Sequence, residues 1–525
     1  MGEDWSFGRI AAAIGGAVDP DLPALIHGDH ITRWGDFDRR TDALSAAYVS
    51  AGAVPGDKVA HLMRNSPAYL ETTFAAFKAR LVHVNVNYRY TGEELLYILE
   101  NSDAAVLVFD ADFADLVDEI RPSLGQVKLF VQVGGLPPAW AKEHDELAKA
   151  VTAPLTLTHR GDDMLFIYTG GTTGYPKGVM WDQSVIWTML GGGAPVIGGA
   201  PLETLEALLD NVHAGIGRRR LLVMPPLMHG SGFLMGLYAI ATGGTAITLP
   251  GASFHPIEAV AACARHKPSS AVIVGDAFAR PFLRALDNGG GDIASLDLII
   301  SSGTMWSPEV KAGLLRHNPK MMLIDALGSS ESIGIGSAVQ GAHNAGEATR
   351  FVHDPDTILV DENLRSVAPG DVGRIARGGL LPRGYYKDAA KTAATFVTID
   401  GRRYAMAGDH AVLDTDGTFT LMGRGNQCIN TGGEKVFPEE VEEMLKTHPA
   451  VDDALVFGMP DETWGQCVTA VVEAEPSEVT AILAHVRRHL AGYKVPKRLL
   501  AVPSMPRGPN GKADYAAAKA MASAL

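Results

Sequence analysis

Short apolar runs alternate with helix-like segments from about residue 20 to residue 350, and this alternation constrains the fold more than any other feature of the chain. The runs at 58–62, 105–109, 271–274 and 296–300 are examples. Strands that alternate with helices in this way are typical of parallel sheets whose faces are covered by helices. We therefore expect an α/β fold in this region.

The 525 residues of the chain exceed what one ordinary core holds, so we expect two or more domains. After about residue 351 the pattern changes to short strands with turn signals, which predicts a small β-rich subdomain. Further on, Pro438 begins an amphipathic helix that strand-like runs follow, and these elements predict a compact α+β module. The expected boundaries are 1–424 for a large N-terminal domain, with the subdomain at about 351–424, and 425–525 for a small mobile C-terminal domain.

Charge and cysteine content limit the partners and the compartment of the chain. A formal net charge of −15 and the lack of a long Lys/Arg run argue against a nucleic-acid surface. Cys263, Cys428 and Cys467 are far apart without C-x-x-C spacing, which indicates neither a zinc site nor a disulfide framework and favours the reducing cytoplasm. The first residues lack the pattern of a signal peptide. The longest apolar stretch, 221–249, contains prolines and glycines, so a buried segment is favoured over a membrane span, and peripheral membrane contact stays open.

A segment rich in glycine and threonine, 168–180, directly follows the apolar run at 164–167. Glycines let backbone N–H groups approach an anion closely, threonine hydroxyls add donors, and Lys177 supplies positive charge, so the segment indicates a phosphate-binding loop. It is not a Walker A loop, because Lys177 is followed by Gly178. The alternative is a flexible surface turn. The residues expected to contact phosphate are Thr169, Gly170, Gly171, Thr172, Thr173, Gly174 and Lys177.

Other segments carry ionisable side chains where a ligand could bind. His229 lies between prolines and glycines, consistent with a pocket, although a lone histidine is more often structural. Glu331 closes a polar segment that follows an expected strand at 321–324, and ligands bind at strand ends in open α/β sheets. This carboxylate could bind Mg²⁺, or it could belong to a helix start capped by Ser329.

Two residues near the C-terminal end give weaker signals when each is taken by itself. Asp409 ends a Gly-Asp pair; a carboxylate accepts hydrogen bonds from a ribose diol, but Gly-Asp is also a common turn. Lys512 lies on a loop rich in proline and glycine, where a lysine is normally a solvated surface charge.

In their order along the chain, these segments closely resemble the adenylate-forming superfamily, which includes acyl-CoA synthetases, peptide-synthetase adenylation domains and firefly luciferase. The resemblance spans nearly the whole chain. The motifs at 168–181, 327–332 and 429–442 are most similar to those of bacterial CoA ligases for long-chain fatty acids and steroid side-chain acids. The resemblance implies ATP, Mg²⁺ and CoA as ligands.

The resemblance also implies a role for each matching residue. Lys512 would contact the carboxylate and the α-phosphate, and His229 would lie at the mouth of the acyl pocket and the pantetheine tunnel. Glu331 and Thr173 would bind Mg²⁺, so these four residues are the expected catalytic set. The further expected contacts are Gly303, Thr304, Met305, Asp325, Leu327 and Gly328 around adenine, Ser329 and Ser330 beside them, Asp409 at the ribose, Arg424 at the ribose or phosphate, and Gly433 and Lys435 in a loop that reaches the pantetheine channel.

The chain departs from the family pattern at three of these positions. Leu327 replaces an aromatic residue, so adenine would be covered by aliphatic contact instead of stacking. Ser330 replaces threonine and keeps the hydroxyl, and Asn426 replaces a charged residue at the expected hinge.

The implied reaction joins a carboxylic acid to CoA through an acyl-adenylate, with release of pyrophosphate and then AMP. The apolar run at 224–237, and a segment 303–306 without charge, favour an apolar acid over an amino acid. The alternatives are an acyl-AMP ligase that delivers to a carrier protein, a non-catalytic nucleotide- or acyl-binding protein, and a luciferase-like oxygenase. A homodimer is the expected oligomer.

Overall fold

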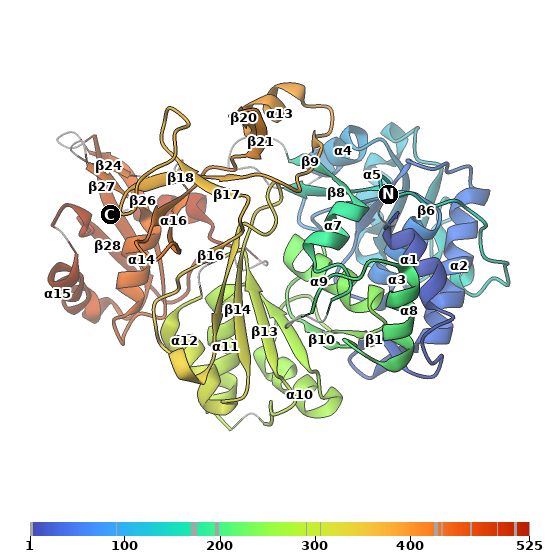
Figure 1. Cartoon of the computed structure of the whole chain (residues 1–525), viewed down its shortest axis with the longest axis horizontal. Helices are drawn as coiled ribbons and strands as arrows, with labels where there is room; N and C mark the ends of the chain where they lie inside the picture. Colours follow the sequence, from blue (N-terminus) through green and yellow to red (C-terminus); the bar gives the residue numbers. More distant parts are fainter. Residues whose placement is uncertain are drawn as a thin grey trace.

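The computed structural model describes residues 4–90, 92–169, 176–194, 199–289, 291–304, 306–424, 429–431, 434–461, 465–490, 492–508 and 512–523. These residues form two large sheets, a smaller antiparallel sheet and a C-terminal sheet, with helices packed against them. Figure 1 shows the two chain ends on opposite sides of the molecule, with the N-terminal residues beside the first large sheet and the C-terminal residues in a small separate unit.

The first large sheet is built from early strands and from one distant pair of residues. In sheet order its strands are β19 (Gly384–Tyr385), β9 (Lys177–Asp182), β8 (Met164–Thr169), β4 (Val82–Asn85), β3 (Lys58–Leu62), β5 (Ala104–Asp110), β6 (Leu129–Val133) and β7 (Lys142–Glu143). The strands from β8 to β7 are parallel, whereas β9 and β19 join antiparallel. The β5 residues from Ala104 to Phe109 are all buried, as expected for a parallel strand with both faces covered.

The second large sheet is also mainly parallel, with antiparallel strands at its edges. In sheet order its strands are β16 (Val352–His353), β15 (Gly336–Gln340), β14 (Met322–Leu327), β13 (Leu298–Ser302), β12 (Ser270–Ile273), β10 (Arg220–Val223), β11 (Thr245–Thr248), β1 (Pro23–His27) and β2 (His30–Arg33). The strands from β14 to β1 are parallel, and β2, β15 and β16 are antiparallel additions at the two edges.

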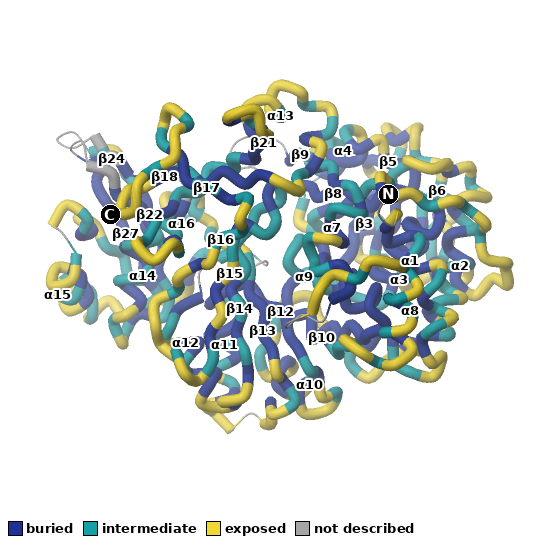
Figure 2. Tube along the Cα trace, in the orientation of Figure 1, coloured by how far each residue is buried: buried dark blue, intermediate teal, exposed yellow. Residues whose placement is uncertain are grey.

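Helices cover these sheets and also lie between them. The helices of this region are α1 (Phe7–Ile14), α2 (Trp34–Ser50), α3 (Pro67–Lys78), α4 (Gly92–Asn101), α5 (Ala114–Ile120), α6 (His144–Ala148), α7 (Gln183–Met189), α8 (Leu205–Ala214), α9 (Gly230–Ala241), α10 (Pro256–His266), α11 (Gly275–Asp287) and α12 (Pro308–His317). One buried cluster contains residues of α1, α3 and α9 together with strands of both sheets. Helix α9 is apolar on nearly all sides, and nine of its 12 residues are buried, so it forms part of the shared core. Figure 2 shows the inner strands dark blue and the outer loops yellow.

Two smaller sheets complete the fold. The antiparallel sheet orders β20 (Phe396–Ile399), β21 (Arg402–Ala405), β18 (Val372–Arg377), β22 (Asp409–Leu413) and β23 (Phe419–Arg424), with β17 (Thr357–Val360) beside β18 and α13 (Ala389–Thr395) before β20. The C-terminal sheet orders β25 (Glu434–Val436), β24 (Ile429–Thr431), β27 (Gly465–Glu473) and β26 (Asp453–Asp461), with β28 (Arg498–Val502) beside β27. Its helices are α14 (Pro438–Lys446), α15 (Val479–His489) and α16 (Tyr515–Ala522).

The predicted α/β class is confirmed, with one correction to the expectation of parallel sheets. Strands that follow a short loop, such as β9 after β8 and β15 after β14, pair antiparallel with the strand before them. A short connection allows only a hairpin, because a parallel partner requires a long crossover. The alternative of a helix start at Ser329 is wrong, since no helix occurs among residues 328–335 and the next element is β15.

Candidate active site

The buried side chain of Asn85 joins two of the predicted segments at the carboxyl end of β4. Its Oδ1 accepts a hydrogen bond from Tyr168 N at 2.7 Å, and its Nδ2 donates to Tyr168 O at 3.1 Å and to Met228 O at 2.9 Å. Tyr168 lies at the end of β8, where the glycine-rich loop begins, and Met228 precedes His229. Asn85 therefore fixes the start of the loop relative to the histidine, although the sequence did not reveal it as a site residue.

Asn85→Ala is expected to destabilise the fold by about 3 kcal/mol, because it leaves buried backbone N–H and C=O groups of Tyr168 without partners. Chemical denaturation followed by circular dichroism measures the change. The matched control is Asn87→Ala, whose half-buried amide accepts from the nearby Arg89 N–H at 3.1 Å and should change stability by less than about 0.5 kcal/mol. Equal stability of the Asn85 variant and the control would show that the hydrogen bonds of Asn85 do not contribute to the stability of the fold.

The glycine-rich loop is closed by a hairpin register that pairs Thr169 with Lys177. The ammonium of Lys177 forms an ion pair with Asp388, whose carboxylate also accepts from Lys391 N at 2.8 Å and caps α13. Because this cation already has a carboxylate partner, its contact with phosphate stays a prediction. Only the backbone of Thr169 is described, and the predicted residues outside the described part of the chain are Gly170, Gly171, Thr172, Thr173, Gly174, Met305, Asn426 and Gly433.

Glu331 lies in a tight turn after β14 that contacts the first sheet. Ser329 N donates to Ser332 O at 2.9 Å, and Glu331 N donates to Ser329 Oγ at 3.3 Å. From the first sheet, Trp181 Nε1 donates to Ser330 O at 2.9 Å and Tyr385 OH donates to Glu331 Oε1 at 2.7 Å. The turn that carries Glu331 is thus held from both large sheets.

Three of the expected adenine residues lie at strand ends in the second sheet. Gly303 has φ of +100° directly after β13, and a Cβ at this position would lie 3.7 Å from Ser231 Oγ, so its neighbour is the first turn of α9. Asp325 is buried and forms an ion pair with Lys311 Nζ at 3.0 Å. Burial raises the pKa of Asp325 to about 6, although the Lys311 ammonium opposes this shift. Leu327 packs beside a buried cluster that includes Phe419.

His229 precedes α9 in extended backbone, and the residue is half-buried. Its Nε2 is buried and has no hydrogen-bond partner among the residues that the structure describes. Burial, together with the charges of Lys512 and Arg89, lowers the pKa of His229 to about 3. The histidine is therefore neutral near pH 7, and Lys512 of the C-terminal unit lies close enough to act on it.

A hairpin-like loop presents Lys512 from the C-terminal unit. Gly508 N donates to Lys512 O at 2.8 Å, and Arg507 pairs with Ala513 in an isolated antiparallel bridge. The Arg507 guanidinium forms an ion pair with Asp453 on β26, with one hydrogen bond of 2.8 Å, which anchors the base of the loop. The exposed Lys512 side chain extends from this base.

The expected ribose residues are brought together by strand pairing. Asp409 begins β22 and is the register partner of Arg424, the last residue of β23. Lys435 lies on β25, opposite Asn430 on β24. Only the backbones of Arg424 and Lys435 are described, so the roles of their side chains stay predictions.

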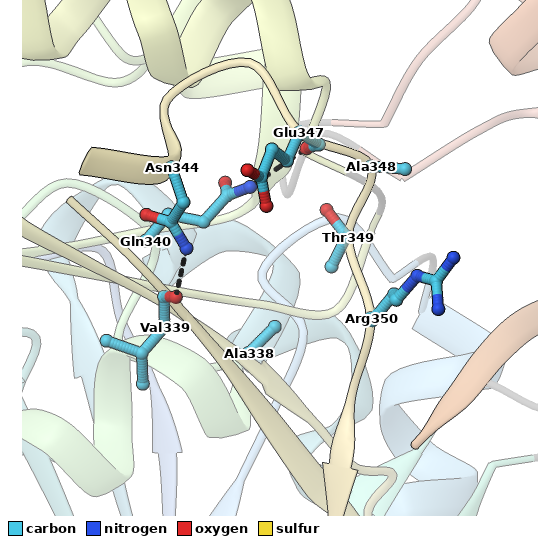
Figure 3. A pocket seen from close by; sticks show the side chains of 8 residues that line it. All are labelled: Ala338, Val339, Gln340, Asn344, Glu347, Ala348, Thr349 and Arg350. Atoms are coloured by element: carbon cyan, nitrogen blue, oxygen red, sulfur yellow. Dashed lines mark hydrogen bonds between the residues drawn. The ribbon is translucent and has the colours of Figure 1, made fainter. Parts of the chain in front are cut away.

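A cavity of about 430 Å³ lies beside β15 and the segment that leads to β16. Its wall is held by hydrogen bonds from Asn344 Nδ2 to Val339 O at 3.3 Å and from Gln340 Nε2 to Glu347 O at 2.9 Å (Figure 3). None of the predicted site residues lines it. One lining residue, Thr349, accepts a hydrogen bond from Lys311 Nζ at 2.7 Å, and Lys311 also pairs with Asp325.

Comparison with known proteins assigns the family. Residues 14–386 match the model of the AMP-binding enzyme family, and residues 440–512 match that of the AMP-binding enzyme C-terminal domain. The chain belongs to the AMP-binding enzymes. This finding confirms the resemblance to adenylate-forming enzymes.

Curated relatives cover nearly the whole chain. A 3-oxocholest-4-en-26-oate–CoA ligase of Rhodococcus rhodochrous is 38% identical over 97% of this chain and 95% of its own length. The medium-chain acyl-CoA ligase Mig of Mycobacterium avium is 36% identical over 96% of each chain. Among solved structures, the anthranilate CoA ligase AuaEII with anthranoyl-AMP aligns with a TM-score of 0.83 at 20% identity, over 100% of this chain and 99% of its own, which shows a shared fold.

The described residues contain neither a candidate membrane span nor a cluster of metal-binding side chains. No helix there is both long and apolar enough to span a membrane. Within the same residues, no group of three or more His, Cys, Asp or Glu side chains could hold a metal ion. The binding of Mg²⁺ by Glu331 therefore stays a prediction.

Proposed function

We propose that the chain is an ATP-dependent, AMP-forming acyl-CoA ligase that activates a lipophilic carboxylic acid. The observation that carries the proposal is the match of residues 14–386 and 440–512 to the two AMP-binding enzyme families, in a structure where the charge of Lys512 from the C-terminal unit acts on His229 of the N-terminal part. The curated relatives align with this chain over nearly their whole length and are named CoA ligases. Their names support the same activity for this chain.

The first half-reaction joins the acid to AMP. The substrate carboxylate attacks the α-phosphorus of ATP, the bond to the β-phosphate breaks, and pyrophosphate leaves with the electron pair. Because one anion attacks another, catalysis requires fixed positive charge, and Lys512 supplies it from the C-terminal unit. The protein forms no covalent intermediate, so no nucleophilic side chain is needed.

The environment of Glu331 fits a magnesium ion. Tyr385 OH donates a hydrogen bond to Glu331 Oε1. Within the described part of the chain the Glu331 carboxylate makes no further hydrogen bond or ion pair, so Oε2 is available to a cation. When bound, Mg²⁺ supplies neutralisation of the phosphate charge. Thr173 of the glycine-rich loop is the second proposed ligand.

Glu331→Gln is expected to raise the Mg²⁺ concentration needed for half-maximal acyl-adenylate formation by about tenfold, because a neutral amide is a poorer ligand for a hard cation. Tyr385→Phe is the matched variant: it removes the hydrogen bond but keeps the carboxylate, and should shift the same midpoint by less than about threefold. Titration of Mg²⁺ at fixed ATP measures both. An unchanged midpoint in the Glu331 variant would mean that Glu331 binds no metal.

The second half-reaction transfers the acyl group from AMP to the CoA thiol. The thiol sulfur attacks the acyl carbonyl carbon, and AMP leaves with the bonding electrons. We assign the approach of the thiol to the cavity beside the loop before His229, which is lined by Tyr88, Met224, Pro226 and Phe278 among others. The neutral imidazole of His229 adds no charge at the mouth of this path.

The substrate class follows from apolar surroundings and from the relatives. Helix α9 and the strand before it present apolar residues around His229. The curated relatives act, by their names, on medium-chain acyl groups or on 3-oxocholest-4-en-26-oate. We infer that this chain also takes a lipophilic acid.

Two assays test the proposed function. Acid-dependent exchange of labelled pyrophosphate into ATP detects acyl-adenylate formation, and AMP release with CoA over a panel of acids detects the complete reaction. We expect both with lipophilic acids. Exchange without CoA consumption would indicate delivery to a carrier protein, and the absence of exchange with every acid would refute the enzymatic function.

We also propose the domain division 1–424 and 425–525, cytoplasmic location and a homodimer. The junction between the two matched family segments supports the division, because 425 falls between residues 386 and 440. Cys263 and Cys467 are buried free thiols, which fits a reducing compartment. Sedimentation analysis tests the dimer.

A further inference from the structure

Helix α14 of the C-terminal unit rests against the N-terminal part of the chain at both of its ends. At its first turn Glu439 lies against Gly423, so closely that a Cβ on this glycine would overlap the carboxylate. At its last residue, Lys446 reaches Asp276 in the first turn of α11, with 3.9 Å between Nζ and Oδ2. Lys446 also forms an ion pair with Glu443.

This contact buries two opposite charges between the units. The Lys446 side chain is 7% exposed and that of Asp276 is 10% exposed. Burial by itself would raise the pKa of Asp276, but the charges of Lys446 and Arg280 outweigh it, so the pKa lies below its usual value. Both groups are therefore ionised near pH 7. Each compensates part of the lost hydration of the other, beside Arg280 at Asp276 and Glu443 at Lys446.

Asp276 also connects this contact with the expected adenine segment. Its Oδ1 accepts from Ser307 N at 2.9 Å, and its Oδ2 accepts from the Ser307 hydroxyl. Ser307 closes the segment that begins at Gly303. One carboxylate thus contacts the C-terminal unit on one side and the end of the predicted nucleotide segment on the other.

We propose that Lys446 is a positioning residue that holds the C-terminal unit in the orientation of this structure, with Lys512 directed toward the acyl-adenylate site, and so favours the first half-reaction. The assignment of half-reactions rests on the proposed function. Lys446 acts through domain position and does not touch the reacting atoms.

The physical basis is a contact that exists in one orientation only. An ion pair made in one of two states shifts the equilibrium by its free energy in that state. When the C-terminal unit turns away, Lys446 and Asp276 regain water, so separation does not leave unpaired charges in a dry interior. Removal of only the Lys446 charge leaves the buried Asp276 with one cation, Arg280 at 3.0 Å, in place of two in the closed orientation, and therefore disfavours that orientation.

Lys446→Met tests this inference, because it keeps most of the side-chain volume and removes the charge. Lys446→Arg, which keeps the charge, is the matched control. A structural readout uses Arg284 and Asp452, an exposed ion pair between α11 and the C-terminal unit. Both are replaced by cysteine, with Cys428→Ser in the background, and the rate of cross-linking by a short bis-maleimide reports how often the two units meet in this orientation.

We expect Lys446→Met to slow cross-linking and acyl-adenylate formation by about tenfold each, while thioester formation from supplied acyl-adenylate changes by less than about twofold. Lys446→Arg should stay near the parent protein in all three. Equal cross-linking rates, or equal loss of both half-reactions, would overturn the proposal. If the parent forms no acyl-adenylate, the proposed function fails, and the cross-linking comparison still decides the role of Lys446.

Asp276→Asn provides a second route if Lys446→Met does not fold, as judged by circular dichroism and thermal melting. It removes the partner charge from the other side of the contact and should also slow cross-linking. In the double variant with Lys446→Met, the effect on cross-linking should be smaller than the product of the two single effects, because both remove the same ion pair. Full multiplicativity would contradict a direct link between the two residues.

Discussion

Lys512→Ala is expected to reduce acyl-adenylate formation by about a thousandfold, the largest effect of any single substitution considered for this chain. Lys512 lies at an exposed position on a loop anchored by Arg507 and Asp453, yet its charge acts on His229 across the domain contact. In the proposed reaction, the Lys512 cation compensates the repulsion between the attacking carboxylate and the α-phosphate. An alanine leaves that repulsion uncompensated in the transition state.

The second half-reaction should respond differently to the same substitution. Departure of AMP needs less help from added positive charge, so thioester formation from supplied acyl-adenylate should fall by less than about threefold. Rapid quench of the two half-reactions measures both rates. Lys497→Ala, at another exposed lysine of the C-terminal unit, is the control and should retain both. Equal loss of the two half-reactions in the Lys512 variant would refute a role confined to adenylation.

The fold class was accessible from the sequence because parallel strands covered by helices have a distinctive apolar pattern. The wholly buried run in β5 is an example. The position of β19 was not accessible: its two residues, Gly384 and Tyr385, join β9 from about 200 positions later in the chain. A strand of this length has no periodicity, and its pairing depends on where the intervening sheet directs the chain.

The candidate site likewise contains residues that could be predicted from the sequence and residues that could not. Glu331, His229 and Lys512 could be proposed because their side chains accompany recognisable glycine, proline or serine patterns in the sequence. Asn85 and Tyr385 could not, because each acts by a hydrogen bond to a residue far away in the chain. Their signal is weak: Asn85 is a single polar residue at the end of an apolar strand, where a satisfied structural amide is equally expected.

The pairing of Lys177 with Asp388 also lay beyond sequence reasoning. The lysine suggested a phosphate contact because it ends a glycine-rich loop, whereas the structure gives it a carboxylate partner at the start of α13. A surface-accessible ion pair contributes little stability, so phosphate could displace Asp388 at small cost. Sequence patterns identify the charge near a site, and only coordinates identify its partner in the absence of ligand.

Selectivity among acids is the second large effect that we expect. Each CH₂ removed from water contributes about 0.8 kcal/mol, so kcat/KM should rise by about fourfold for each added carbon in a series of straight-chain acids, until the pocket is full. The measurement is AMP release with saturating ATP and CoA over even-numbered acids from acetate upward. The physical reason for this rise is the proposed apolar surroundings of the acid near His229, between the apolar elements β10 and α9.

A matched pair of acids separates hydrophobic size from shape. An acid with an ammonium at its far end, compared with the unsubstituted acid of the same chain length, should lose at least about a hundredfold in kcat/KM, because an unpaired buried charge costs several kcal/mol. The segments that approach His229 offer no compensating carboxylate at Gly303 or Thr304. If acetate or an α-amino acid exceeded every lipophilic acid, the inferred substrate class would be wrong, while pyrophosphate exchange with that substrate would still establish acyl-adenylate chemistry.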